Sequence, residues 1–162
     1  MNCAFCPHHK CYTSGQNCTR ITHEEINEYY TDEDKKMMRA SSATESRNYL
    51  KMTRLEESVY FAKEMGIKKV GIAFCIGLAN EAHFCAQYFK TQGFEVQSVC
   101  CKVCSVDKEM MELEKIKPGQ REAMCNPKVQ ARLLNEGGTE LNFIVGLCVG
   151  HDMLFTMESK AP

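Results

Sequence analysis

Short apolar runs and amphipathic stretches alternate along the chain from Lys69 onward. The run at 70–76 is continuously apolar, which is typical of a strand buried on both faces of a sheet. Further strands are predicted over 95–103 and 141–149, and helices over 79–92, 108–115 and 127–135. Strands that alternate with helices favour a parallel sheet with right-handed crossovers, so this part is expected to be α/β.

The stretch 20–66 carries a helical pattern instead. Thr22 with Glu25 and Thr53 with Glu56 have the spacing of capping boxes, which mark helix starts. A further start is predicted at Thr31, where three acidic residues follow. The last of these helices has one apolar stripe and should end at Gly66.

Residues 1–19 have few aliphatic side chains and cannot form a hydrophobic core alone. The expected organisation is a cysteine-rich metal-binding arm at 1–19, a helical segment at 20–66 and a Rossmann-like α/β core at 67–162, with 20–162 forming one compact unit. The sheet should be small and parallel, with three strands or four, flanked by helices. Since three strands are few, we expect a further strand beyond the sequence or another subunit to complete the sheet, which would make a homo-oligomer.

Composition and charge narrow the function classes. The net charge is −1 and no basic face is evident, which argues against nucleic acid as a partner. No stretch reaches the roughly 20 apolar residues of a membrane helix, so no membrane role is expected. The N-terminus lacks the apolar core of a signal peptide, which predicts a cytoplasmic protein.

Cysteine is the unusual component, with 11 residues in 162. A disulfide framework is the first alternative, but the count is odd, secretion is not signalled, and the chain is long enough to bury a core. In a reducing compartment, clustered cysteines more often bind metals or serve redox chemistry. We therefore expect thiolate chemistry rather than disulfide staples.

The first cysteine group is Cys3-x2-Cys6-x4-Cys11-x6-Cys18. Four thiolates complete the tetrahedral shell of Zn²⁺ and would make a closed, structural site. The same four residues would equally suit an iron–sulfur cluster. One of the nearby histidines could replace a thiolate ligand; they are His8, His9 and His23. The spacing also resembles a zinc knuckle, although the expected surface is not basic.

The second group lies where the predicted strands and one helix meet. Cys75 ends the first strand, Cys101 ends the second, Cys148 ends the third, and Cys125 precedes the helix that starts at Pro127. Because ligands of open parallel sheets bind at the carboxyl ends of the strands, these four cysteines are expected to share one cofactor-binding site. Neighbouring strand residues face opposite ways, so of Cys100 and Cys101 only one can point to it, and Cys101 is favoured.

Simpler interpretations stand beside this one. Free cysteine is among the most buried residue types, so each strand-end cysteine could be ordinary core. Cys75 or Cys148 could instead be a catalytic nucleophile, activated by a helix N-terminus and by His151. Asp152 could equally cap a helix, which would leave His151 as a loop residue.

The residues also carry a family resemblance. Phe74-Cys75-Ile76-Gly77-Leu78, Cys100-Cys101-Lys102, Cys125-Asn126-Pro127 and Val145–Asp152, behind a CxxC-type N-terminus, resemble the domain of unknown function 1847 family. The resemblance implies a cysteine-rich, metal-binding protein of anaerobic bacteria or archaea. It implies eight motif positions, namely Cys3, Cys6, Cys11, Cys18, Cys75, Cys101, Cys125 and Cys148. It also implies a further strand beyond Pro162, so that this chain would be truncated.

The leading expectation is a protein that binds Zn²⁺ or an iron–sulfur cluster through thiolates. It would serve redox, electron-transfer or metal-handling chemistry, with a redox protein as its partner. One alternative is a cysteine-nucleophile enzyme with its site at the strand ends. The other is an interaction module stapled by zinc and without chemistry, so whether the protein is an enzyme stays open.

Overall fold

The computed structural model describes all residues, 1–162, and the chain divides into two compact units, Met1–Arg39 and Ala40–Pro162. In the first unit no side chain is buried, and Cys6, Lys35 and Met37 are the residues that are not fully exposed. Residues 20–39 contain no buried side chain, and the grouping of 20–162 as one compact unit stays a prediction.

The first unit holds the 3-10 helix η1 (Cys3–Phe5), α1 (Lys10–Thr13), α2 (His23–Tyr29) and the beginning of α3 (Asp32–Asn48). The predicted capping box is present at α2, where the Thr22 side chain accepts from the Glu25 N–H and the Glu25 carboxylate accepts from the Thr22 N–H. Thr31 and Asp34 exchange the same pair of bonds at the start of α3. These caps satisfy backbone N–H groups that a helix start leaves free.

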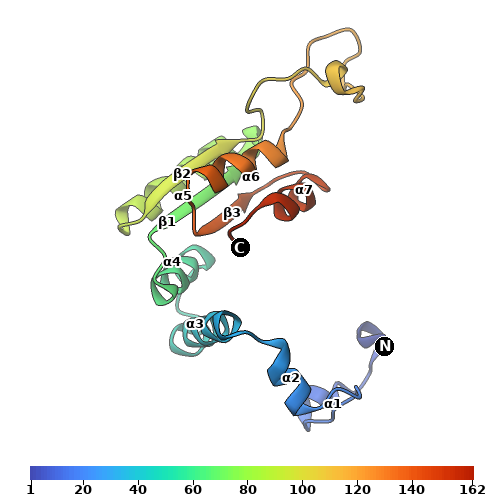
Figure 1. Ribbon diagram of the computed structural model, residues 1–162, viewed down its shortest axis with the longest axis vertical. Helices are drawn as coiled ribbons and strands as arrows, with labels where there is room; N and C mark the ends of the chain where they lie inside the picture. Colours follow the sequence, from blue (N-terminus) through green and yellow to red (C-terminus); the bar gives the residue numbers. More distant parts are fainter. The chain divides into compact units, whose positions relative to one another are not determined.

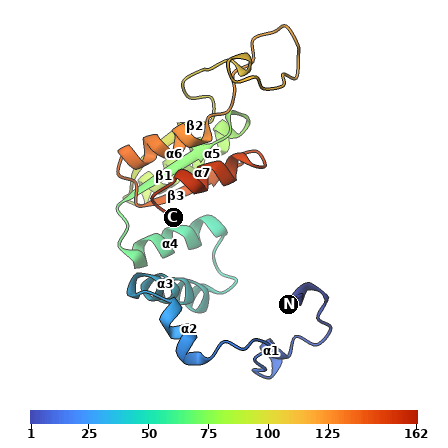
Figure 2. The same ribbon diagram turned by 45° about the vertical axis from the view of Figure 1, so that its right-hand side comes forward.

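The second unit is the predicted α/β fold (Figures 1 and 2). It continues from α3 through α4 (Arg54–Met65), β1 (Lys69–Phe74), η2 (Ile76–Leu78), α5 (Ala79–Thr91), β2 (Glu95–Cys100), η3 (Lys108–Met111), α6 (Pro127–Glu136), β3 (Leu141–Val145) and α7 (His151–Glu158). The three strands form a parallel sheet in the order β2-β1-β3. None of the helices combines the length and apolar character that crossing a membrane requires.

Helices pack on both faces of the sheet (Figure 2). On one face, Val70 and Ile72 of β1 pack with side chains of α4 and α5, including the fully buried Phe89. On the other, Ala73 and Val99 pack with α6 and α7, including Leu134 and Phe155. Burial of β1 on both faces explains its continuously apolar sequence.

All three strands are shorter at their carboxyl ends than predicted. β1 ends at Phe74, because the chain turns there into η2; β2 ends at Cys100, where Val103 donates to the Cys100 carbonyl at 3.1 Å in a tight turn. β3 ends at Val145, because Gly146 adopts a positive φ of 63°. The predicted helix at 108–115 is a single 3-10 turn, η3.

The β2–α6 connection, residues 101–126, extends beyond the carboxyl ends of the strands (Figure 1). Charged side chains hold it, since Asp107 and Lys115 pair at 2.7 Å and Lys108 and Glu122 pair at 2.8 Å. Asp107 and Ala123 form an antiparallel bridge between its two arms. The two ends of the connection therefore lie side by side next to the sheet.

Candidate functional site

Two cysteine thiols meet where this connection begins and ends. Cys101 directly follows β2 and is 1% exposed, while Cys125 precedes α6 and is half-buried. The Cys125 side chain is near enough to the Cys101 thiol to raise its pKa. The backbone N–H of Asn126 donates to the Cys101 carbonyl at 2.8 Å, so the two segments are joined at the pair. We call Cys101 and Cys125 the thiol pair.

The two members of the thiol pair have different surroundings. The pKa of the Cys101 thiol is raised to about 12, mainly by burial; the backbone N–H of Ile76, 3.3 Å from its Sγ, acts in the opposite direction, and the neighbouring Cys125 contributes to the rise. At Cys125, the Lys102 ammonium donates to Sγ at 3.4 Å and to the Ala123 carbonyl at 2.7 Å. Cys101 is therefore held as a thiol, whereas Cys125 has a cation beside its sulfur.

Of the two adjacent cysteines, Cys101 reaches the pair. The Cys100 sulfur accepts instead from the backbone N–H of Lys102 at 3.5 Å, within its own turn. Cys104 is exposed and has a positive φ of 68°. Cys85, in α5, packs against the core beside Phe89, and burial raises its pKa.

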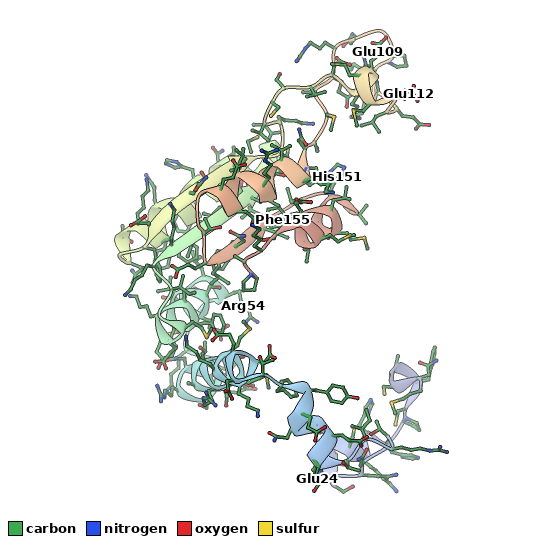
Figure 3. All side chains as sticks on the ribbon, viewed as in Figure 1. Glu24, Arg54, Glu109, Glu112, His151 and Phe155 are labelled. Carbon is green, nitrogen blue, oxygen red and sulfur yellow. The ribbon has the colours of Figure 1, made fainter.

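Cys75, Cys148 and His151 lie at the same end of the sheet but make backbone contacts only. The Cys75 N–H donates to the Val145 carbonyl at 3.0 Å, and its side chain is half-buried. Cys148 is exposed, and its carbonyl accepts from the His151 N–H at 2.9 Å. His151 is the first residue of α7 (Figure 3), which is capped by Gly150 rather than by Asp152. Cys75 and Cys148 as nucleophiles, and a shared site for all four strand-end cysteines, stay predictions.

Two of the N-terminal cysteines, Cys3 and Cys6, lie at the ends of a compact turn. The Cys6 N–H donates to the Cys3 carbonyl at 3.1 Å, and the Cys6 side chain is partly shielded while Cys3, Cys11 and Cys18 are exposed. The backbone N–H groups of His8 and His9 hydrogen-bond to the Cys6 sulfur and lower its pKa. Two amide donors stabilise a thiolate, which is the form of cysteine that binds a metal.

The ligands for a metal are thus available in the arm, although they are not assembled. No three His, Cys, Asp or Glu side chains anywhere in the chain come together as a metal ion would require. The donor set of the arm still fits Zn²⁺ or an iron–sulfur cluster, since it offers four sulfurs, and backbone N–H groups lower the pKa of one of them.

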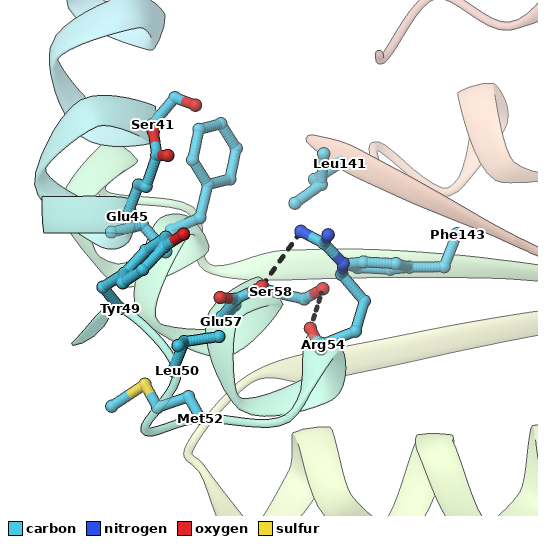
Figure 4. A pocket seen from close by; sticks show the side chains of 12 residues that line it. Ser41, Glu45, Tyr49, Leu50, Met52, Arg54, Glu57, Ser58, Leu141 and Phe143 are labelled. Carbon is cyan, nitrogen blue, oxygen red and sulfur yellow. Dashed lines mark hydrogen bonds and ion pairs between the residues drawn. The ribbon is translucent and has the colours of Figure 1, made fainter.

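The second unit also contains a cavity of about 610 Å³ (Figure 4). It is lined by α3, α4 and β3, and its wall includes Arg54 and Glu57, which pair at 2.9 Å. Its remaining walls are mixed, with Tyr49 and Phe143 beside hydroxyl and carboxylate groups. The lining holds no cysteine and no histidine, so this cavity is separate from the thiol pair.

Two residues of the strand-end region were not predicted from the sequence. Lys102 stands beside an apolar run, where a lysine usually marks a solvated strand end. Gln130 lies in an amphipathic helix, yet it is 0% exposed and donates to the Val99 carbonyl at 2.8 Å and the Phe74 carbonyl at 3.3 Å. A glutamine on the otherwise apolar face of α6 is an exception to the usual polarity pattern, and this exception could have indicated a buried, hydrogen-bonded side chain.

Comparison with known proteins identifies the family of the chain but assigns it no activity. An uncharacterized protein of Methanocaldococcus jannaschii is 52% identical over 163 aligned residues, which cover 100% of this chain and 83% of the relative. No solved structure matches the chain. The model of the family described as "Protein of unknown function (DUF1847)" matches residues 13–162. The chain therefore belongs to the DUF1847 family.

Proposed function

We propose that the protein binds a metal centre, Zn²⁺ or an iron–sulfur cluster, through the thiolates of Cys3, Cys6, Cys11 and Cys18 in its N-terminal arm. The observation that carries the proposal is the group of four cysteines within residues 3–18, at one of which, Cys6, the backbone N–H groups of His8 and His9 lower the pKa. Amides that point at a sulfur stabilise its negative charge, and a metal-bound thiolate needs that stabilisation.

The burial pattern of the arm supports the same function. No side chain between Met1 and Arg39 is buried, so hydrophobic packing does not organise this unit. Four cysteines within residues 3–18 offer a different source of order, because metal binding contributes folding free energy directly. A bound metal would thus replace the core that the arm lacks.

The identity of the metal decides what the centre does. Four thiolates around Zn²⁺ leave no open position, so a zinc centre would be structural and would staple the arm. An iron–sulfur cluster on the same ligands would carry electrons and would need a redox partner protein. Metal handling is the third role, and it requires that the metal leave readily.

The test is metal analysis of full-length protein purified without oxygen. We expect about one zinc ion, or the iron and acid-labile sulfide of one cluster, per chain. Visible absorption separates the two, because only the cluster is coloured. Cys3→Ser and Cys6→Ser should each lose most of the metal, since both remove a ligand from the same turn.

Cys104→Ser and Cys85→Ser are the matched controls, because they remove a thiol outside the arm. Both should keep the full metal content. Protein that contains neither metal nor sulfide, or metal that is retained by Cys3→Ser and Cys6→Ser alike, would refute the proposal.

A further inference from the structure

The thiol pair in the second unit has a geometry that a buried core does not require. Two sulfurs lie together at the carboxyl edge of the sheet, and a lysine ammonium donates to one of them at 3.4 Å. We propose that Cys125 and Cys101 are a redox-active dithiol that reduces disulfides by thiol–disulfide exchange, with Cys125 attacking and Cys101 resolving. This inference is independent of the metal centre in the arm.

The two sulfurs have the surroundings that these two roles need. Cys125 is half-buried, so a disulfide can approach it, and its sulfur accepts a hydrogen bond from the Lys102 ammonium. Cys101 is 1% exposed, so an external disulfide cannot reach it. The Cys125 side chain is its neighbour, so Cys101 can attack a disulfide formed on Cys125.

The position of Lys102 argues for reactivity over packing. Its ammonium is fixed by the Ala123 carbonyl at 2.7 Å and points at the sulfur instead of into solvent. A cysteine that only fills space gains nothing from a cation beside it. The bond from the Asn126 N–H to the Cys101 carbonyl keeps the two chain segments in place for closure of a disulfide.

The exchange has two steps. The Cys125 thiolate attacks a substrate disulfide, a sulfur–sulfur bond forms between Cys125 and one half of the substrate, and the other half leaves as a thiolate that takes up the proton lost by Cys125. Cys101 then attacks the Cys125 sulfur, and its proton goes to the second leaving thiolate. Two electrons pass to the substrate, which ends as two thiols, while Cys101 and Cys125 end as a disulfide.

Oxidised glutathione is a suitable probe of this chemistry, and tryptic digestion reads out the product. Cleavage without reduction yields the peptides 91–102 and 122–128, which carry Cys101 and Cys125 respectively. We expect anaerobically purified full-length protein to yield these two peptides linked by one disulfide after incubation with the probe. Released glutathione should amount to two molecules for each link formed.

Cys100 offers a matched control, because it lies in the same tryptic peptide as Cys101. Cys100→Ser should form the link at the wild-type rate. Cys101→Ala should instead accumulate glutathione on Cys125, since the resolving sulfur is absent. In the Cys101→Ala background, Lys102→Met should slow that accumulation at least several-fold.

Three results would overturn the inference. One is a link that forms in Cys101→Ala but not in Cys100→Ser. Another is wild-type protein in which peptide 122–128 stays unmodified, a result that does not depend on the folding of any variant. The third is a loss of bound metal in Cys101→Ala and Cys125→Ser equal to that in Cys6→Ser, which would make the pair metal ligands.

Discussion

The Gln130 side chain of α6 donates from Nε2 to the Val99 carbonyl of β2 at 2.8 Å, with both groups inside the protein. The same nitrogen is 3.3 Å from the Phe74 carbonyl at the end of β1. One buried amide therefore ties α6 to two strand ends, next to the place where Cys101 and Cys125 meet. Its Oε1 has no hydrogen-bond partner.

Gln130→Ala should destabilise the protein by about 2 kcal/mol, because it leaves buried carbonyls without their donor and opens a cavity. The midpoint of urea unfolding measures this change. Arg132→Ala is the control on the same helix, since its ion pair with Glu136 is exposed and should contribute less than about 0.5 kcal/mol. Equal midpoints for the two variants would contradict a role for Gln130 in fixing the strand ends.

The Asp107 carboxylate holds the β2–α6 connection through three contacts. It accepts from Lys115 at 2.7 Å and from the N–H groups of Glu109 and Glu122 at 2.9 and 3.0 Å, and these contacts hold the pKa of Asp107 at about 2, with the Lys115 hydrogen bond as the largest cause. A depressed pKa stabilises the folded connection above the ordinary value of 3.8, and this stabilisation is lost as the pH falls towards 2.

Asp107→Asn should therefore speed tryptic cleavage after Lys115 several-fold at pH 7. Glu109→Gln is the matched control, because Glu109 also contacts Lys115 but is mostly exposed (Figure 3). Peptide mapping over time measures both rates. If the two variants are cleaved equally fast, Asp107 is not the residue that holds the connection.

The sequence predicts the order of the strands and helices better than the residues at which they end. The apolar run 70–76 identified β1, because a central strand is buried on both faces, but the run continues past Phe74 into a turn whose residues are also apolar. The hydrophobic pattern does not show that the Ile76 N–H leaves the strand hydrogen bonding and donates to the Cys101 sulfur instead. Such a switch depends on a partner 25 residues away.

The same limit applies to the site. Placing Cys101 and Cys125 at one edge followed from the topology of a parallel sheet. Which of the strand-end thiols touch depends on turns that the sequence pattern does not specify, such as the one after Cys100. The contact of Lys102 with Cys125 could not be predicted either, since a long side chain can fold back to Cys125 or extend into solvent.

Burial of Cys101 should make the protein sensitive to alkali. Its folded pKa is about 12 against an ordinary value of 9.0, so between these values the unfolded chain loses the thiol proton while the folded chain keeps it. Stability from this group is complete below pH 9 and decreases as the pH rises towards 12. Urea midpoints at increasing pH should fall more steeply for the wild type than for Cys101→Ala; parallel curves would contradict the shift.

Cys6 should stay reactive at lower pH than an ordinary cysteine in metal-free protein. The N–H groups of His8 and His9 lower its pKa, so the thiolate, which is the form that iodoacetamide attacks, persists further into the neutral range. Alkylation of metal-free, full-length protein at several pH values, followed by peptide mapping, measures this. If the pH at which alkylation is half-maximal is equal to or higher than that of a cysteine in a short unstructured peptide, the two amides do not stabilise the Cys6 thiolate.

Oxidation of the thiol pair should stabilise the second unit. A bond between Cys101 and Cys125 closes a loop around the whole β2–α6 connection, and loop closure of this size restricts the unfolded chain by about 3 kcal/mol. For a chain of this length that corresponds to a rise in Tm of about 6–12 °C. Calorimetry of oxidised and reduced protein measures the shift.

Cys100→Ser should show the full rise and Cys101→Ala none, because the bond needs the buried sulfur. A lower Tm after oxidation of the wild type would mean that the bond strains the turn after β2, and a dithiol cycling at this edge would then favour the reduced form.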